Sequence, residues 1–310
     1  MSAPRTISLP SQDLIDAVGQ FPQNLKPVLW DLQNDPQVPL EEIDIAVMPY
    51  MATANTLHNV RKAPNLKIVQ TQTTGYDGMV ELIGDRANIN TAAGVHAAST
   101  AEMAIGLAIA SLRGFPQSVR DQQEGHWNPQ QWPGLADRTV GLVGVGGIGE
   151  EIRKRLAPFE VNLLRFGSSA RTDEHGQVHA TTELAKFAPQ IEVLILIVPL
   201  NDSTHHLVDA KLLAQLPDGA TIVNVARGPV VDTDALVAEV ASGRLNVASD
   251  VFDPEPLPKD HPLWGCPNAL IIPHNGGNTG AFFPRMVKLL QRQLVAWSAD
   301  EAGENLVHRS

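Results

Sequence analysis

The stretch TVGLVGVGGIG, residues Thr139 to Gly149, decides the fold of this chain. Its first five residues are mostly apolar and β-branched, which predicts a short buried strand. The next six fit the pattern G-x-G-x-x-G, and Ile152, Leu156 and Phe159 then recur on one face of a predicted helix. A strand, a glycine turn and a helix in this order predict a binding site for the pyrophosphate of a dinucleotide.

The glycines of this motif have distinct physical roles. Gly144 allows the tight turn, Gly146 lets the backbone approach the phosphates, and Gly149 lets the helix pack closely against the strand. Gly147 and Ile148 complete the predicted pyrophosphate-binding segment, where the helix N-terminus offers free N–H groups and the positive end of its dipole. A glycine turn with only a structural role is the alternative.

Composition and charge narrow the class of protein. Hydrophobic residues make up 43% of the 310 residues and charged residues 18%, which is typical of a globular protein with room for two domains. The N-terminus lacks an apolar signal core, so we expect a cytoplasmic protein. The net charge of −11, without a basic cluster, argues against nucleic acid or a membrane as a partner. The single cysteine excludes an intramolecular disulfide, and His205-His206 lacks a third ligand for a metal.

Alternation of apolar runs with helical segments predicts an α/β protein with two domains. Continuous apolar strands after Thr139 indicate a doubly wound parallel sheet, and the segments before residue 98 indicate a smaller, flavodoxin-like α/β domain. We expect a dinucleotide-binding Rossmann domain over residues 99–279, inserted into a substrate-binding domain made of residues 1–98 and 280–310. The expected strands are 28–30, 43–48, 67–70, 89–91, 139–143, 161–166, 193–198, 220–225, 245–251 and 270–272.

Helical periodicity predicts the remaining elements. The expected helices are 14–18, 56–61, 79–85, 99–112, 148–157, 182–188, 209–216, 232–241 and 282–297. The apolar side of the last helix is expected to consist of Met286, Leu289, Leu290 and Val295. Residues 113–137 are polar and contain Trp127 and Trp132, and we expect them to form a loop in which these rings pack in the core or against a second subunit.

The segment after the second strand of the Rossmann domain bears on the choice of nicotinamide cofactor. A fold that prefers NAD usually ends this strand in Asp or Glu, which binds the ribose 2′-hydroxyl. Here the strand ends at Gly167, followed by Ser168, Ser169 and Arg171, whose hydroxyls and guanidinium suit a 2′-phosphate. This favours NADP(H) over NAD(H). The alternative is that this segment is a solvated loop without a role in cofactor choice and that NAD(H) binds instead. The nearby acidic residues Asp173 and Glu174 weaken the argument for a 2′-phosphate slightly.

Three polar residues, Arg227, Glu255 and His274, each follow one of the last three expected strands. Because α/β proteins bind ligands at the carboxyl edge of the sheet, we expect these side chains to converge near the nicotinamide. Arg227 would pair with the carboxylate of a 2-keto acid and polarise its keto oxygen. His274 would donate the proton. Glu255 would orient the His274 side chain and raise the pKa of His274. Each residue alone is more often a surface or capping residue, and only their coincidence with the glycine turn indicates chemistry.

The chain resembles the D-isomer-specific 2-hydroxyacid dehydrogenases over most of residues 70–297. The resemblance is carried by GVGGIG (144–149), VPLNDSTHHL (198–207), NVARGPVVD (224–232), DVFDPEPLP (250–258) and PHNGG (273–277). It implies a discontinuous substrate-binding domain around a Rossmann domain, usually in a homodimer. By the same resemblance, Arg227 is the substrate-binding arginine, Glu255 the carboxylate partner and His274 the acid/base histidine.

Further site residues are implied by the resemblance alone. Thr74 and Gly75 belong to a first-domain loop whose backbone N–H groups hold the substrate carboxylate. Asp250 contacts the nicotinamide amide. The implied cofactor-binding residues outside the glycine turn and the 2′-phosphate segment are Thr100, Pro199, Thr204, Ala226 and Asp250.

The chain departs from the family pattern at Ser249, Asn275 and Asn278, which leaves the substrate preference open. The GSSAR segment resembles that of NADP-dependent glyoxylate/hydroxypyruvate reductases. We therefore expect NADPH-dependent reduction of a small 2-keto acid to the D-2-hydroxy acid. One alternative is an NAD-dependent dehydrogenase of another 2-hydroxy acid, such as 3-phosphoglycerate. The other is a catalytically weak, nicotinamide-sensing regulator.

Overall fold

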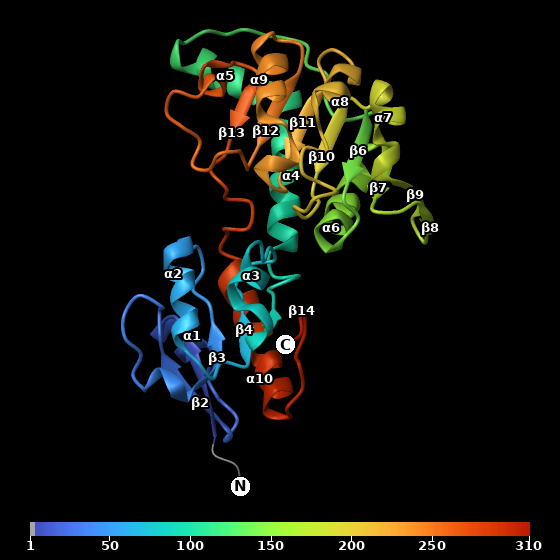
Figure 1. Cartoon of the computed structure of the whole chain (residues 1–310). Coiled ribbons are helices and arrows are strands. Elements are labelled where there is room, and N and C mark those ends of the chain that lie inside the picture. The colour runs from blue at the N-terminus through green and yellow to red at the C-terminus, as the bar shows by residue number, and fades with distance from the viewer. Residues whose placement is uncertain (1–3) are drawn as a thin grey trace. The chain divides into compact units, whose positions relative to one another are not determined.

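The computed structural model describes residues 4–310, which divide into two compact units. Unit 1 contains the described residues through His96 together with Gly280–Ser310, and unit 2 contains Ala97–Thr279. Each unit is built around its own sheet (Figure 1). Among residues 4–310, no helix is long and apolar enough to cross a bilayer, and no three His, Cys, Asp or Glu side chains are grouped to hold a metal ion.

The sheet of unit 2 has eight strands. They are β6 (Thr139–Val143), β7 (Asn162–Gly167), β8 (Arg171–Asp173), β9 (Gly176–Ala180), β10 (Val193–Leu196), β11 (Thr221–Asn224), β12 (Asn246–Ser249) and β13 (Ala269–Ile271). Their order is β13-β12-β11-β10-β6-β7-β9-β8, and all neighbours are parallel except the β8–β9 hairpin. The strand order reverses between β6 and β10, the switch point at which doubly wound folds bind ligands.

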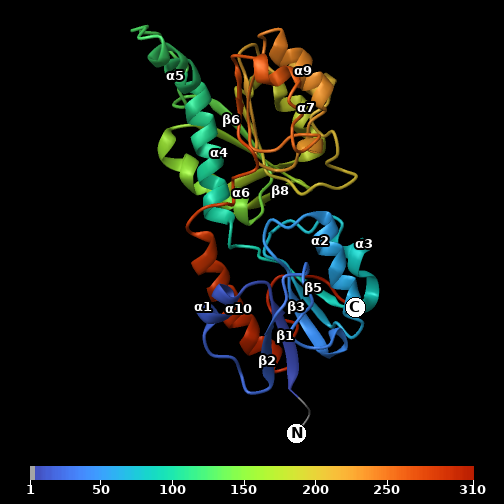
Figure 2. The same ribbon diagram turned by 90° about the vertical axis from the view of Figure 1, so that its left-hand side faces the viewer.

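Helices cover both faces of this sheet (Figure 2). They are α4 (Ala97–Leu112), α6 (Gly147–Leu156), α7 (Leu184–Phe187), α8 (Ala210–Gln215) and α9 (Thr233–Ala241). Side chains of one strand alternate between the two cores: Ile195 packs on the side of α4 and α6, whereas Leu194 and Leu196 pack on the side of α7, α8 and α9. The predicted doubly wound sheet is confirmed.

Two parts of unit 2 differ from the sequence-based expectation. Residues 113–137 are not a continuous loop, because α5 (Phe115–Gln123) begins after Gly114 and is held by polar contacts such as Gln117 Nε2 to Asp121 Oδ1 at 2.7 Å. Its exposed, polar sequence lacks the apolar periodicity that reveals other helices. The β8–β9 hairpin was likewise not predicted, since β8 is a short and exposed edge strand.

The sheet of unit 1 has six strands. They are β1 (Arg5–Leu9), β2 (Leu25–Leu29), β3 (Ile43–Val47), β4 (Ile68–Gln70), β5 (Asn88–Asn90) and β14 (Leu306–His308). Their order is β14-β5-β4-β3-β1-β2, parallel except for β14, and the first five strands follow the flavodoxin-like order. The predicted flavodoxin-like class is confirmed, but the strands β1 and β14 were missed.

Helices also cover both faces of the sheet of unit 1. Helices α1 (Gln12–Val18) and α10 (Phe282–Ser298) share one core, and α2 (Ala54–His58) and α3 (Met79–Ile83) lie on the other side (Figure 2).

The expected apolar face of α10 requires one correction. Val295 is 68% exposed, and Leu294 and Trp297 are buried instead. The spacing explains this, since Leu294 lies one turn beyond Leu290 on the same face and Val295 is rotated away from it.

Candidate active site

The glycine turn joins β6 to α6 at the switch point. Gly144 has φ +116°, and a Cβ there would lie 2.3 Å from the carbonyl oxygen of Ile197, so only glycine fits. A Cβ on Gly149 would lie 2.0 Å from the carbonyl oxygen of Gly144, so the close packing of α6 also requires glycine. Gly146 and Gly147 have open space beside their Cα atoms. The accessible backbone and the first N–H groups of α6 therefore fit the pyrophosphate of a dinucleotide.

The carboxyl end of β7 lies beside this turn. A Cβ on Gly167 would lie 3.0 Å from Val145 Cγ2 and 3.2 Å from Arg171 Nη1. The guanidinium of Arg171 therefore lies near the position from which an acidic side chain projects in NAD-preferring folds. Arg171 Nη1 donates to the carbonyl oxygen of Ser169 at 3.3 Å, and Ser168, Ser169 and Arg171 are exposed. This group of donors fits a phosphate.

A buried arginine in β7 holds the tip of the β8–β9 hairpin. Arg165 is 5% exposed, and its Nη1 and Nη2 donate to the carboxylate of Asp173 at 3.0 and 2.7 Å. Arg165 Nη2 also donates to the carbonyl oxygen of Gly176 at 2.8 Å. The hydrogen bond from Arg165, with that from the His175 N–H, lowers the pKa of Asp173 to about 2. The charge of Asp173 is therefore paired, although it lies two residues from Arg171.

Glu255 and His274 form a hydrogen-bonded pair at the carboxyl edge of the sheet. The loop after β12 supplies Glu255, whose Oε2 lies 2.8 Å from His274 Nδ1 and whose Oε1 accepts from the Phe252 N–H at 2.8 Å. His274 follows β13, and its side chain is 46% exposed. No residue among 4–310 is a hydrogen-bond partner of His274 Nε2, so this nitrogen is available to a ligand.

The pair perturbs the pKa of both groups in opposite directions. The hydrogen bond that His274 donates to the Glu255 carboxylate raises the pKa of His274 against the effect of burial, and the charges of Glu255 and Asp250 add to the increase. Burial raises the pKa of Glu255, but the hydrogen bonds from His274 and Phe252 and the charges of His274 and Arg227 outweigh it, so the net pKa is lowered. The arrangement stabilises protonated His274 beside ionised Glu255.

Arg227 lies close enough to this pair for its charge to lower the pKa of both His274 and Glu255. It follows β11, where Asn224 Nδ2 donates to the carbonyl oxygen of Arg227 at 3.0 Å. The next residue must be glycine, because a Cβ on Gly228 would lie 1.9 Å from the carbonyl oxygen of Phe252. Gly228 thus lets the Arg227 loop and the Glu255 loop approach each other.

Asp250 binds the turn that follows His274. Its buried carboxylate accepts from the backbone N–H groups of Asn275 at 2.7 Å and Gly276 at 2.8 Å. Burial raises the pKa of Asp250, although these two N–H groups oppose the increase. A Cβ on Gly276 would lie 2.6 Å from Asp250 Oδ2 and 3.7 Å from Thr100 Cγ2, so Thr100 in α4 belongs to the same cluster.

The departure at Ser249 has a structural account. Ser249 is buried, and its hydroxyl donates to the carbonyl oxygen of Val251 at 2.7 Å, in the turn that leads from β12 to the Glu255 loop. The expected apolar residue would leave this turn without that bond. Asn278 donates its N–H to the carbonyl oxygen of Asn275 at 2.9 Å, which extends the turn after His274.

The remaining expected cofactor residues lie in the loops after β10 and β11 and at the start of α6. Thr204 Oγ1 donates to the carbonyl oxygen of Pro199 at 2.6 Å, which folds this loop and leaves Pro199 exposed. Ala226 is buried, and its carbonyl oxygen accepts from Arg227 Nη1 at 2.7 Å. Ile148 packs partly against the core on the side of α4.

Thr74 and Gly75 belong to unit 1, in the loop after β4. Their backbone N–H groups have no acceptor among residues 4–310, and both residues are only partly exposed. The loop is fixed from within, since Thr73 Oγ1 donates to the carbonyl oxygen of Gly75 at 2.6 Å. Adjacent, unpaired N–H groups on a fixed loop can bind an anion.

The two sheets, the glycine turn and the histidine–carboxylate pair define a nicotinamide-dependent oxidoreductase. The model of the NAD binding domain of the D-isomer specific 2-hydroxyacid dehydrogenases matches residues 105–276. The chain belongs to this family and is an NAD(P)-dependent 2-hydroxyacid dehydrogenase.

Relatives of known sequence and structure are consistent with this membership. The chain is 33% identical over 259 residues to a glyoxylate reductase of Thermofilum pendens, covering 80% of this chain and 76% of that protein. A D-isomer specific 2-hydroxyacid dehydrogenase from Xanthobacter autotrophicus Py2 in complex with NADPH and MES superposes with a TM-score of 0.83 at 25% identity, covering 99% of this chain and 98% of the other. An NADPH-dependent glyoxylate/hydroxypyruvate reductase from Sinorhizobium meliloti, in complex with NADP and malonate, superposes with a TM-score of 0.80 at 26% identity. The match covers 99% of this chain and 97% of the other.

Sequence reasoning missed several residues that shape the site. Asp173 lies in the β8–β9 hairpin, which was not predicted, and its pairing with Arg165 of β7 depends on a strand register that no local pattern reveals. Gly228, which follows Arg227 in the same motif, could have indicated the close approach of another backbone segment, that of Phe252.

Proposed function

We propose that the protein reduces a small 2-keto acid, of the glyoxylate or hydroxypyruvate type, to the D-2-hydroxy acid with NADPH. The observation that carries the proposal is the Glu255–His274 pair, which leaves Nε2 available at the edge of the sheet that bears the glycine turn. The pair lies within electrostatic reach of Arg227. An acid, its orienting carboxylate and an anion-binding guanidinium are the groups that reduction of a 2-keto acid requires.

Each residue has a separate part in the proposed reaction. Arg227 pairs with the substrate carboxylate and polarises the keto oxygen, and the N–H groups of Thr74 and Gly75 bind the same carboxylate. Protonated His274 donates the Nε2 proton to the keto oxygen as it gains negative charge. Glu255 holds the imidazole through Nδ1, and this hydrogen bond raises the pKa of His274 and so favours its protonated form. The nicotinamide cofactor, when bound, supplies the hydride that reaches the keto carbon.

We infer that the 2′-phosphate of NADPH binds Ser168, Ser169 and Arg171. Gly167 lacks the carboxylate that would repel this phosphate, and the guanidinium of Arg171 lies close to it. The nearest carboxylate in sequence, Asp173, is already paired with Arg165. Two structural relatives are described as complexes with NADPH and NADP, which agrees with this preference.

The first test is the initial rate of reduction with NADPH and with NADH. Each cofactor is combined with glyoxylate, hydroxypyruvate, pyruvate and a bulkier 2-keto acid. We expect higher kcat/KM with NADPH and with the smaller substrates. A strong preference for NADH would contradict the 2′-phosphate site, and cofactor binding without reduction of any 2-keto acid would support the regulator.

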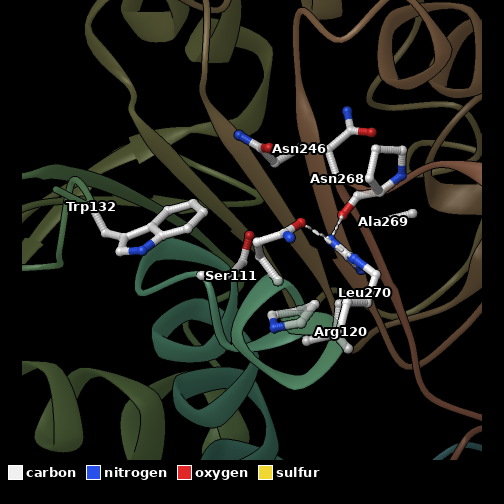
Figure 3. A pocket seen from close by; sticks show the side chains of 11 residues that line it. Ser111, Arg120, Trp132, Asn246, Asn268, Ala269 and Leu270 are labelled. Carbon is white, nitrogen blue, oxygen red and sulfur yellow. Dashed lines mark hydrogen bonds between the residues drawn. The ribbon is translucent and has the colours of Figure 1, made fainter. Parts of the chain in front are cut away.

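The expected homodimer belongs to the same proposal. Helix α5 and the segment after it expose large apolar side chains, namely Phe115 (52%), Val119 (55%) and Trp127 (92%). In contrast, Trp132 packs within unit 2, because a Cβ on Gly114 would lie 2.1 Å from its ring. Beside Trp132 is a pocket of about 220 Å³ lined by Ser111, Arg120 and Asn246 (Figure 3). We propose that a second copy of the chain covers this surface of α5.

A further inference from the structure

The C-terminal residues that follow α10 bind the end of β5 in unit 1. We propose that Asn305, together with Gln293, positions the Thr73–Gly75 loop so that its N–H groups can bind the substrate carboxylate. The proposal rests on the function proposed above, which assigns Thr74 and Gly75 to that carboxylate. It adds two positioning residues, one in α10 and one in the segment before β14.

Gln293 is the junction of a buried amide network. It is fully buried, and its Nε2 donates to Gln70 Oε1 at 2.7 Å and to the carbonyl oxygen of Glu304 at 3.0 Å. Its Oε1 accepts from the Glu304 N–H at 2.7 Å. A Cβ on Gly303 would lie 2.4 Å from this Oε1, so the chain comes this close only because residue 303 is glycine. With both ends of its amide paired, Gln293 fixes the C-terminal segment against β4.

Asn305 extends this attachment beyond the end of β5. Its Nδ2 donates to the carbonyl oxygen of Ala93 at 3.0 Å, and its own carbonyl oxygen accepts from the Thr91 N–H at 3.0 Å. Asn305 has φ +57°, a left-handed conformation that asparagine tolerates better than most residues. Asn90 Nδ2 donates to the carbonyl oxygen of Glu304 at 2.7 Å. The C-terminal segment is thus bound to residues 90, 91 and 93.

Residues 90–93 in turn carry the Thr73–Gly75 loop. The Ala92 N–H donates to the carbonyl oxygen of Thr73 at 2.9 Å, and Thr74 Oγ1 donates to the carbonyl oxygen of Ala92 at 3.5 Å. Asn305 is therefore hydrogen-bonded to Ala93, and the adjacent residue in the chain, Ala92, is hydrogen-bonded to Thr73 and Thr74. A site made of backbone N–H groups cannot adjust by changing a rotamer, so its geometry depends on the contacts that hold the backbone.

The test is Asn305→Asp, measured by steady-state kinetics with the best 2-keto acid and NADPH. The variant keeps the size and the tolerance for positive φ, but it turns a carboxylate toward the Ala93 carbonyl oxygen. We expect the KM for the 2-keto acid to rise roughly three- to tenfold, as expected for one lost hydrogen bond, while the KM for NADPH stays within about twofold. Asn305→Gly keeps the positive φ and removes only the donor, so a smaller increase is expected.

The matched control is Asn65→Asp, since Asn65 Nδ2 donates to the carbonyl oxygen of Glu41 at 2.8 Å elsewhere in unit 1. It should leave both KM values unchanged. A lowered Tm with unchanged KM in Asn305→Asp would overturn the proposal and leave only a role in stability. If Asn305→Asp does not fold, the KM of Asn305→Gly for the 2-keto acid is measured instead, and an unchanged KM would again overturn the proposal. The wild-type assay comes first, because absence of any reduction would overturn the proposed function itself.

Discussion

At the scale of single residues, the backbone of His274 has a constrained conformation. It has φ +52°, which is uncommon for a side chain of this size. Its N–H donates to the carbonyl oxygen of Asp250 at 2.9 Å, and the Asp250 carboxylate binds the two N–H groups that follow. The surroundings therefore over-determine a conformation that an isolated chain would rarely adopt, as is common where a side chain must be aimed at a ligand.

Replacing the acid should remove chemistry and leave cofactor binding intact. His274→Asn is expected to lower kcat for 2-keto acid reduction by about 10²–10⁴-fold, because the proposed proton donor is then lost. The Kd of NADPH, measured by fluorescence titration, should stay close to the wild-type value. An unchanged kcat would eliminate the role of His274.

The carboxylate partner should set the pH range of the reaction. In the proposed reaction His274 is the proton donor. Its hydrogen bond to the Glu255 carboxylate raises the pKa of His274, so activity should persist to higher pH and fall as pH rises through that pKa. Glu255→Gln removes the negative charge, so burial and the charge of Arg227 then lower the pKa of His274. The descending limb of the kcat/KM profile should therefore move to lower pH.

A control for this shift is Glu239→Gln, which breaks an ion pair with Arg244 elsewhere in unit 2. Its profile should match that of the wild type. If the limb does not move in Glu255→Gln, the observed pKa does not belong to the Glu255–His274 pair.

At the scale of elements, the β8–β9 hairpin is the feature that links cofactor choice to the sheet. Its strand β8 begins with Arg171 and ends with Asp173, so a cation and an anion lie on the same short edge strand. Arg165 pairs with Asp173, and the one partner of the Arg171 guanidinium within residues 4–310 is the Ser169 carbonyl oxygen at 3.3 Å. The hairpin thus presents a positive group to the segment after Gly167.

Breaking the Arg165–Asp173 pair should weaken the binding of NADPH more than that of NADH. In Arg165→Met, Asp173 loses its partner and can pair with Arg171 or repel the 2′-phosphate, so the KM for NADPH should rise roughly tenfold. The KM for NADH should change by less than about twofold, since NADH has no 2′-phosphate. The double variant Arg165→Met/Asp173→Asn should recover part of the loss.

The comparison variant is Arg244→Met, because Arg244 also binds a carboxylate, that of Glu239, and two backbone carbonyl oxygens in the same unit. It should leave the NADPH to NADH ratio unchanged. If Arg165→Met raises the KM for NADPH and the KM for NADH equally, Arg165 supports only the fold.

At the scale of the whole molecule, the exposed side chains of α5 bear on assembly. Val119→Glu/Trp127→Ala removes apolar surface that the chain itself does not cover. If a second copy covers it, the wild type should have twice the monomer mass by light scattering after size exclusion, and the variant should dissociate at micromolar concentration. Phe283→Ala, at a residue of unit 1 that is 41% exposed, is the control. A monomeric wild type would refute the proposed homodimer.

The sequence by itself determined the features that depend on neighbours within about ten residues. The glycine turn from Gly144 to Gly149 and the alternating strands and helices follow from periodicity and backbone sterics, which are local. The doubly wound class follows from their order. The types of residue placed after the last three strands also suggested acid chemistry at the sheet edge, before any distance was known.

Only the tertiary structure decided features that depend on distant partners. Helix α5 and strand β8 are polar and exposed, so no periodic pattern marks them. The pairing of Arg165 with Asp173 joins two different strands of the sheet, and that of Asn305 with Ala93 joins residues 212 positions apart. The energy of such contacts exists only once the chain has folded, so no local pattern in the sequence reports it.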